Sequence, residues 1–245
     1  MLSQRIEAAV AQFRDFQPSD VSLKGPSPEE LCPYIDHTLL KPDATSAEIN
    51  QLCQDAITYG FTTVCVNSSW IPFCVSAFAE RTTTTIPIAV VGFPLGAGIR
   101  GSKSYEAKLA IQAGAKEIDM VLHIGKLKEH EYDYVFEDIM DVYETCGRIP
   151  LKVILETSML SRSEIIAACV ICKEIGVSFV KTSTGFGGGG ARSDDVALMK
   201  AVVGENIQVK ASGGIRTYED AVRMYNAGAR RIGASSSIAI VTKRQ

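Results

Sequence analysis

The protein is a chain of 245 residues, 46% of them hydrophobic and 22% charged, which is enough to build one well-packed domain and suits a (β/α)₈ barrel. Its formal net charge of −3, with both signs interleaved along the chain, provides no basic surface for a nucleic-acid backbone or an anionic membrane. We therefore expect a small-molecule ligand, with no nucleic-acid or membrane partner.

The first thirty residues predict an appendage. Over residues 2–16, helical spacing brings together on one face Leu2, Ile6, Ala9, Val10 and Phe13. The polar, proline-containing stretch 17–30 then predicts a linker. The chain accordingly divides into an N-terminal helix and linker (1–30) and a main domain (31–245). The sequence leaves open whether the helix caps the bottom of that domain or faces a second subunit.

The main domain alternates between two patterns. Its short apolar or β-branched runs cover residues 34–40, 61–67, 86–93, 116–124, 151–156, 177–183, 207–212 and 231–236. Helical stretches lie between them, many of which open with Ser, Thr or Asp and close on Gly. Strands alternating with such helices imply right-handed βαβ units and a parallel sheet. Eight units predict an α/β fold, a closed (β/α)₈ barrel with an extra N-terminal helix, and an open doubly wound sheet is the alternative.

Polar side chains gather where the predicted strands end. The candidates in chain order are Asp36, Thr38, Cys65, Asn67, Asp119, Lys152, Glu156, Lys181, Lys210, Ser235 and Ser236. Active sites of (β/α)₈ barrels form at the carboxyl ends of the strands and in the loops that follow. These residues therefore predict the position of an active site.

Two lysines on neighbouring predicted strands indicate amine chemistry. Lys181 follows Phe179 and Val180, so desolvation favours its neutral, nucleophilic form. Lys210 lies on the next strand, about 4.8 Å away, where a second ammonium group would repel the first. This is how a Schiff-base lysine is activated near neutral pH. The alternative is that each lysine pairs structurally with Asp119 or Glu156, or extends to the barrel rim.

Glycine-bearing loops follow the last three predicted strands. They are TSTGFGGGG (182–190), SGGI (212–215) and GASSS (233–237). Such loops expose backbone N–H groups, hydroxyls and helix amino ends, which together bind phosphate without raising the net charge. Glycine also serves tight turns for conformation alone. Three loops in succession favour a phosphate site.

Cysteines and histidines indicate neither disulfides nor a metal site. The seven cysteines, an odd number, stand in apolar contexts, which is typical of reduced core residues in a cytoplasmic protein. Cys169 and Cys172 form a C-x-x-C inside a helical pattern, and we interpret them as core residues. The three histidines lack metal-ligand spacing, so we expect no metal. From its sequence context alone, Cys65 is interpreted as a core residue. Asp119 is interpreted as a counter-ion of Lys210 and as a proton relay through water, two roles that are compatible.

Eight motif segments together resemble a known family. They are YIDHTLLKPDAT, VCVNSSWI, VVGFPLGAG, EIDMVLHIGKLK, LKVILET, FVKTSTGFGGGGA, VKASGGIRTYEDA and GASSS. In this order they are similar to the 2-deoxyribose-5-phosphate aldolases, class I aldolases that need no metal. The resemblance covers residues 34 to 237. It implies a (β/α)₈ barrel, no cofactor, a phosphorylated sugar substrate and a place in deoxyribonucleotide catabolism, and it leaves open a homo-oligomer, dimer or tetramer.

The resemblance also implies roles for single residues. Lys181 corresponds to the Schiff-base lysine, Lys210 to the lysine that perturbs it, and Asp119 to the partner in proton transfer. The implied substrate-binding residues are Asp36, Thr38, Cys65 and Thr184, with Gly185, Gly213, Gly214, Ser235 and Ser236 at the phosphate.

Two positions depart from the family pattern. Some members carry a lysine after S-T-G that helps hold phosphate, whereas this chain has Phe186. Some members end in a tyrosine-bearing tail, whereas this chain ends IVTKRQ. Two other functions stay open: another phosphate-binding Schiff-base barrel enzyme, such as a transaldolase, and a non-catalytic barrel that acts as a binding module.

Overall fold

A closed parallel barrel forms the centre of the molecule. The computed structural model describes residues 1–18, 24–79 and 81–243. Over these residues each strand pairs in parallel with the next, and β8 closes the barrel on β1. The strands are β1 (Ile35–Leu39), β2 (Thr63–Asn67), β3 (Ile86–Val91), β4 (Glu117–Val121), β5 (Leu151–Ile154), β6 (Phe179–Lys181), β7 (Gln208–Ser212) and β8 (Ala229–Ala234). The predicted (β/α)₈ barrel is confirmed, and the open doubly wound sheet is wrong.

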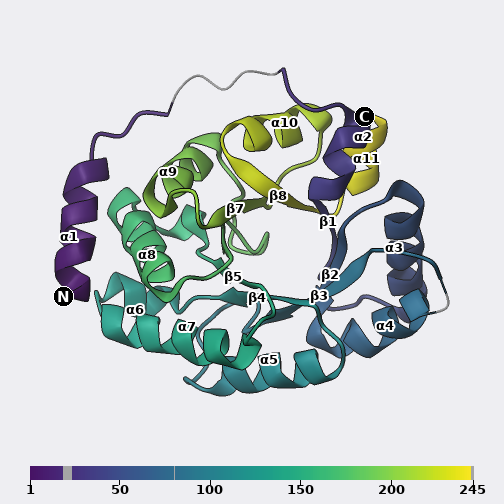
Figure 1. Ribbon diagram of the computed structural model, residues 1–245, viewed down its shortest axis with the longest axis horizontal. Coiled ribbons are helices and arrows are strands. Elements are labelled where there is room, and N and C mark those ends of the chain that lie inside the picture. The colour runs from purple at the N-terminus through teal and green to yellow at the C-terminus, as the bar shows by residue number, and fades with distance from the viewer. Residues whose placement is uncertain (19–23, 80, 244–245) are drawn as a thin grey trace.

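Helices surround the barrel (Figure 1). They are α1 (Leu2–Phe13), α2 (Pro28–Leu31), α3 (Ser46–Tyr59), α4 (Ile71–Ala79), α5 (Ser102–Gln112), α6 (Ile124–Lys128), α7 (Tyr132–Cys146), α8 (Arg162–Ile175), α9 (Ser193–Val203), α10 (Tyr218–Asn226) and α11 (Ser237–Thr242). Local sequence sets their ends. The hydroxyl of Thr45 accepts from the backbone N–H of Glu48 at the start of α3, and Gly60 ends that helix in the left-handed conformation.

Two boundaries differ from the sequence prediction. β8 begins at Ala229, two residues before the predicted run, because the exposed Arg230 and the inward Arg231 hide the strand pattern. The predicted linker 17–30 is also not linker throughout, because Ser27 caps the short helix α2, which begins at Pro28. Residues 19–23 of that linker lie outside the described residues.

The N-terminal helix α1 packs on the outside of the barrel, mainly against α8 and also against α7 and α9 (Figure 1). Ile6 is buried in this contact. The Arg162 guanidinium of α8 donates to the carbonyl oxygens of Arg14 and Phe16, which follow the last turn of α1. Because the main contacts of α1 are with helices, α1 does not cap the bottom of the barrel. Within the described residues, no helix is long and apolar enough to cross a bilayer.

The two faces of the barrel wall carry different side chains. Outward residues such as Val64 and Met120 belong to the large apolar core that the helices cover. Inside the barrel, the buried apolar cluster is small and consists of Leu40, Cys65, Ile88 and Val90, with Phe93 packed against it. The remaining interior contains buried charged side chains, and these lead to the candidate site.

Candidate active site

A cavity of about 420 Å³ opens where β1, β6, β7 and β8 end. The loops after these strands form its walls. Of the residues predicted from sequence, the cavity is lined by Thr38, Lys181, Thr184, Gly185, Gly213, Gly214 and Ser235. The structure therefore brings together residues that are up to two hundred positions apart in the chain, as the barrel geometry predicts.

Lys181 connects this cavity to the charged interior of the barrel. It is the last residue of β6, it lines the cavity, and only 3% of its surface is exposed. Its Nζ lies 2.8 Å from Oδ2 of Asp119 on β4. The amine thus faces the cavity on one side and the Asp119 carboxylate on the other. A ligand in the cavity can therefore reach it.

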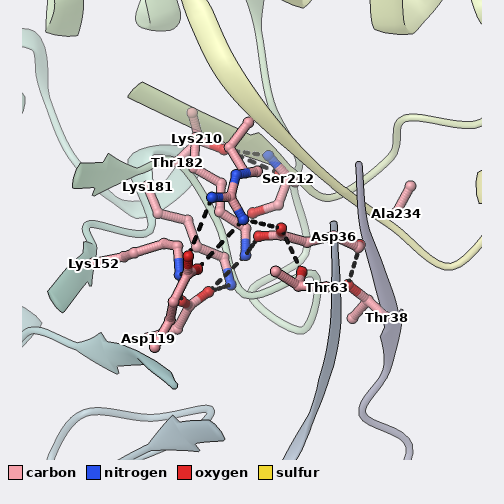
Figure 2. Close-up of polar contacts among 12 residues, drawn as sticks. Asp36, Thr38, Thr63, Asp119, Lys152, Lys181, Thr182, Lys210, Ser212 and Ala234 are labelled. Carbon is pink, nitrogen blue, oxygen red and sulfur yellow. Dashed lines mark hydrogen bonds and ion pairs between the residues drawn. The ribbon is translucent and has the colours of Figure 1, made fainter. Parts of the chain in front are cut away.

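The carboxylate of Asp119 contacts three lysines (Figure 2). Lys210 Nζ lies 2.7 Å from the same Oδ2 that Lys181 contacts, and Lys152 Nζ lies 2.8 Å from Oδ1. Lys210 also forms an ion pair with Asp36. All of these side chains are fully buried apart from the slight exposure of Lys181. Lys152, which the sequence predicted at the end of its strand, instead points into the barrel from the second position of β5.

The pKa values of the two predicted active-site lysines are shifted in opposite directions. Burial lowers the pKa of Lys181 below its ordinary value, and the positive charge of Lys210 lowers it further, against the opposing attraction of Asp119. Burial also acts to lower the pKa of Lys210, but the carboxylates of Asp119 and Asp36 outweigh it and raise that pKa. Lys210 thus holds its proton firmly, whereas Lys181 releases its proton more easily.

Asp119 stays ionised in this surrounding. Burial acts to raise its pKa, but Lys152, Lys181 and Lys210 together hold the pKa well below the ordinary range. The structural ion pair considered as an alternative for both lysines is therefore present at Asp119. The other partner considered, Glu156, is paired with neither lysine. Its Oε2 accepts instead from the hydroxyl and the backbone N–H of Thr184, 3.2 Å away in the latter case.

Asp36 and Cys65 lie deeper than the cavity. Asp36 Oδ1 accepts from Thr63 Oγ1 at 2.6 Å and from Arg231 Nη1 at 2.7 Å. Cys65 is fully buried in the small interior cluster, and burial raises the pKa of its thiol. Neither residue lines the cavity, so the substrate contact that the resemblance implies for them stays a prediction.

The glycine loops form part of the cavity wall. Gly185, Gly213 and Gly214 have φ values of 86°, 85° and 75°, which favour glycine over residues with a Cβ. Ala191 N–H donates to the carbonyl oxygen of Gly213 at 2.9 Å and so ties two of the loops together. Backbone N–H groups at such turns can cradle an anion. Ser235 lines the cavity with these loops, whereas Ser236 does not.

The sequence prediction missed two cationic residues at the cavity. Lys41 follows β1 and Arg216 follows β7, and both line the cavity. The Lys41 Nζ lies 2.6 Å from Oε1 of Glu48 on α3. The signal was present, because both residues lie inside motif segments, in the stretches that follow predicted strand ends. They place positive charge beside Phe186, which is 52% exposed at the same cavity.

Potential metal ligands do not cluster within the part of the chain that the structure describes. No group of three or more His, Cys, Asp or Glu side chains is arranged to hold a metal ion there. The buried carboxylates Asp36 and Asp119 are instead paired with lysine and arginine.

Comparisons with known proteins agree with this geometry. Two curated relatives are deoxyribose-phosphate aldolases. That of Mycoplasma capricolum is 50% identical over 216 residues, which is 88% of this chain and 96% of the relative. That of Clostridium kluyveri is 51% identical over 218 residues, or 88% and 99%.

Solved structures show the same relationship. A deoxyribose phosphate aldolase from Aeropyrum pernix superposes with a TM-score of 0.81 at 29% identity, over 97% of this chain and 95% of the other. A proposed deoxyribose-phosphate aldolase from Coccidioides immitis superposes with a TM-score of 0.91 at 42% identity, over 99% and 96%. A family model described as DeoC/LacD family aldolase matches residues 31–243. The chain therefore belongs to the DeoC/LacD family of aldolases, which are carbon–carbon lyases.

Proposed function

We propose that the protein is a class I aldolase that reversibly cleaves 2-deoxy-D-ribose 5-phosphate to D-glyceraldehyde 3-phosphate and acetaldehyde. One observation carries the proposal. Lys181 lines the cavity with a buried amine, and its neighbours Asp119 and Lys210 influence the pKa of that amine. An amine with a lowered pKa is the nucleophile that Schiff-base chemistry needs near neutral pH.

The reaction begins at the amine of Lys181. Its nitrogen attacks the aldehyde carbon C1 of the open-chain sugar, and loss of water gives a protonated imine. Removal of the proton from the C3 hydroxyl then lets the C2–C3 bond break. Its electron pair forms the C1–C2 double bond of a neutral enamine, and C3 leaves as the aldehyde of glyceraldehyde 3-phosphate. Protonation at C2 and hydrolysis release acetaldehyde and restore the amine.

Asp119 and Lys210 serve proton transfer in this scheme. The low pKa of Asp119 makes it a poor final acceptor for a proton, so we assign it the role of a relay that passes the proton on through water. Lys210 keeps its charge and acts through Lys181. Asp119 also faces the imine nitrogen directly, because it contacts Lys181 Nζ.

The phosphate would bind at the glycine loops. The backbone of Gly185, Gly213 and Gly214 supports this assignment, with Ser235 beside it and Arg216 as a nearby cation. A neutral phenyl ring at Phe186 leaves the anion to the backbone and to these neighbours. No observation favours a transaldolase-like enzyme or a non-catalytic binding module.

Three further assignments belong to the proposal. We assign residues 31–245 to the catalytic barrel and residues 1–30 to an appendage, which the family match to residues 31–243 supports. We also assign a homo-oligomer, supported by the tetramer described for the Aeropyrum pernix enzyme. A cytoplasmic role in deoxyribonucleotide catabolism is consistent with seven free cysteines. Sedimentation of the full chain and of a chain starting at residue 31 tests whether α1 takes part in assembly.

The experiment that tests the function traps the imine. Borohydride is added to the protein with 2-deoxyribose 5-phosphate, and the labelled peptide is identified by mass spectrometry. We expect one adduct, on Lys181, and retro-aldol turnover that persists with a chelator present. Lys181→Met should lose both the adduct and the turnover, while Lys128→Met, on the surface, keeps them. An adduct on another lysine, or a folded wild type without turnover, contradicts the proposal.

A further inference from the structure

A closed ring of alternating charges crosses the barrel interior beneath Lys181. Each member contacts the next through an ion pair, and the six members come from five strands. In order around the ring they are Arg231, Glu117, Lys152, Asp119, Lys210 and Asp36, and Asp36 contacts Arg231 again. The ring extends well beyond the lysine pair and Asp119 of the reaction proposed above.

The far half of the ring lies on β8, β4 and β5. Arg231 Nη2 lies 3.2 Å from Glu117 Oε1, and its Nη1 lies 3.3 Å from Oε2. Lys152 Nζ bridges the two carboxylates of β4, at 2.5 Å from Glu117 Oε2 and 2.8 Å from Asp119 Oδ1. Arg231 and Lys152 also both lie over the ring of Phe179, at 5.4 and 5.6 Å from its centroid.

The near half closes through β7 and β1. Lys210 joins Asp119, at 2.7 Å from Oδ2, to Asp36. Asp36 Oδ1 then returns to Arg231 Nη1 at 2.7 Å. The side chains of Asp36 and Lys210 are fully buried, and that of Arg231 is 12% exposed. Water therefore screens these charges little. The balance of positive and negative charges in the ring then determines how costly a further charge in the barrel interior is.

The charges of the ring balance without Lys181. Three cations, Arg231, Lys152 and Lys210, face three anions, Glu117, Asp119 and Asp36. A protonated Lys181 would be a fourth cation without an anion of its own, because Asp119 already has two other lysines. In a low-dielectric interior such a surplus charge is costly, and releasing the proton removes it.

Among the described residues, no other charged group forms an ion pair with Lys181 besides Asp119. Cys65 of β2 faces it as an uncharged thiol, since burial raises the thiol pKa. Ile88 and Val90 of β3 are apolar. Glu156, after β5, is a further buried carboxylate, but it accepts hydrogen bonds from Thr184 in the loop above and forms no ion pair with Lys181.

We propose that Arg231, Glu117 and Lys152 are positioning residues of the aldolase, which balance the charge of the barrel interior so that Lys181 stands ready as a neutral amine. The inference rests on the proposed function, because it concerns the same amine. The positive charge of the iminium has no counter-charge left in the ring, which favours its conversion to the neutral enamine and hence bond cleavage.

Charge balance makes a prediction that a packing role does not. Removing a ring cation leaves an excess of negative charge and should raise the pKa of Lys181. Removing a ring anion leaves an excess of positive charge and should lower it. Removing one of each should return it to the wild-type value. A residue that merely supports the fold would reduce activity without a shift whose sign follows its charge.

The experiment measures the rate of imine trapping at Lys181 against pH, with 2-deoxyribose 5-phosphate and cyanoborohydride, in Arg231→Met, Glu117→Gln and the double variant. Circular dichroism verifies the fold, and Lys152→Met replaces Arg231→Met if the latter does not fold. Matched controls are Arg230→Met, the exposed neighbour on β8, and Glu129→Gln on the surface.

We expect the apparent pKa of trapping to rise by about one unit in Arg231→Met, to fall by about one unit in Glu117→Gln, and to return to within about half a unit of wild type in the double variant. The controls should match wild type. Shifts of the same sign in both single variants, or no shift in folded variants, overturn the charge-balance inference alone. A wild type that forms no adduct on Lys181 contradicts the proposed function itself, so the two failures are distinguishable.

Discussion

Lys181 and Lys210 donate to the same oxygen of Asp119, at 2.8 and 2.7 Å from Oδ2. The two amines therefore share one negative charge, but Lys210 has a second carboxylate, Asp36, and Lys181 does not. This asymmetry decides which lysine releases its proton. It also explains why two lysines that are paired in register on neighbouring strands have opposite pKa shifts.

The first prediction concerns Lys210→Met. Losing this cation removes its repulsion of the Lys181 ammonium and frees Asp119 to hold the proton on Lys181. We expect kcat/KM at pH 7.5 to fall by about 100-fold or more, and the acid limb of its pH profile to move up by about one unit. Lys108→Met, at an exposed position of α5, is the control. A lower kcat/KM with an unchanged pH profile would show that Lys210 does not control the pKa of Lys181.

The second prediction concerns the loop that Glu156 holds. The buried carboxylate of Glu156 accepts from the Thr184 hydroxyl, and Thr184 Oγ1 in turn accepts from the N–H of Phe186 at 3.0 Å. Thr184→Val leaves the carboxylate without its hydroxyl donor, so we expect a loss of about 1–3 kcal/mol in the free energy of unfolding, measured in urea. We also expect KM to rise more than kcat falls. Thr184→Ser, which keeps the hydroxyl, should behave like wild type, and an equal loss in this variant would contradict the assignment of the effect to the hydroxyl alone.

The third prediction concerns Phe186→Lys. The phenyl ring is half exposed at the cavity and makes an edge contact with Phe93, 5.4 Å between centroids, so a longer cationic side chain has room there. An added charge-assisted contact to phosphate should lower KM for 2-deoxyribose 5-phosphate by roughly tenfold. Unphosphorylated 2-deoxyribose should be unaffected, and Phe186→Leu serves as the uncharged control. An equal gain with both sugars would argue against a phosphate at this end of the cavity.

The fourth prediction concerns acid stability through His37. Burial lowers the pKa of His37 to about 4, although Asp55 Oδ2 lies 3.9 Å from its Nε2. In the unfolded chain the ordinary value is about 6.5, so between the two values the unfolded state binds more protons. The contribution of the neutral His37 to the free energy of unfolding is therefore fully present above about pH 6.5. It is lost as the pH falls toward 4.

We expect this group to remove roughly 3 kcal/mol of unfolding free energy between pH 7 and pH 4. Urea unfolding of wild type and of His37→Gln across this range measures the effect. The variant should show a correspondingly flatter dependence on pH, while His130→Gln, at an exposed site, should follow wild type. Parallel curves for all three proteins would assign the acid sensitivity to other groups.

The sequence alone determined the architecture and the neighbourhood of the two lysines. Alternating strand and helix patterns are local signals, and in a barrel that closes in chain order each strand lies beside the next one. Lys181 and Lys210, on consecutive strands, could therefore be expected to meet, and the glycines after the last three strands could be expected to share one face. The start of β8 was missed because the exposed charge of Arg230, next to the inward Arg231, interrupts the apolar pattern on which strand prediction depends.

Only the tertiary structure decided the depth of each side chain and its partners across the barrel. Chain order cannot show that Glu117 meets Arg231, or that Asp36 lies below the cavity beside Lys210, because these contacts depend on the stagger of the strands around the closed barrel. The cavity positions of Lys41 and Arg216 likewise depend on how separate loops converge. Local patterns specify which residues face inward, whereas closure of the barrel determines which of those inward charges face one another.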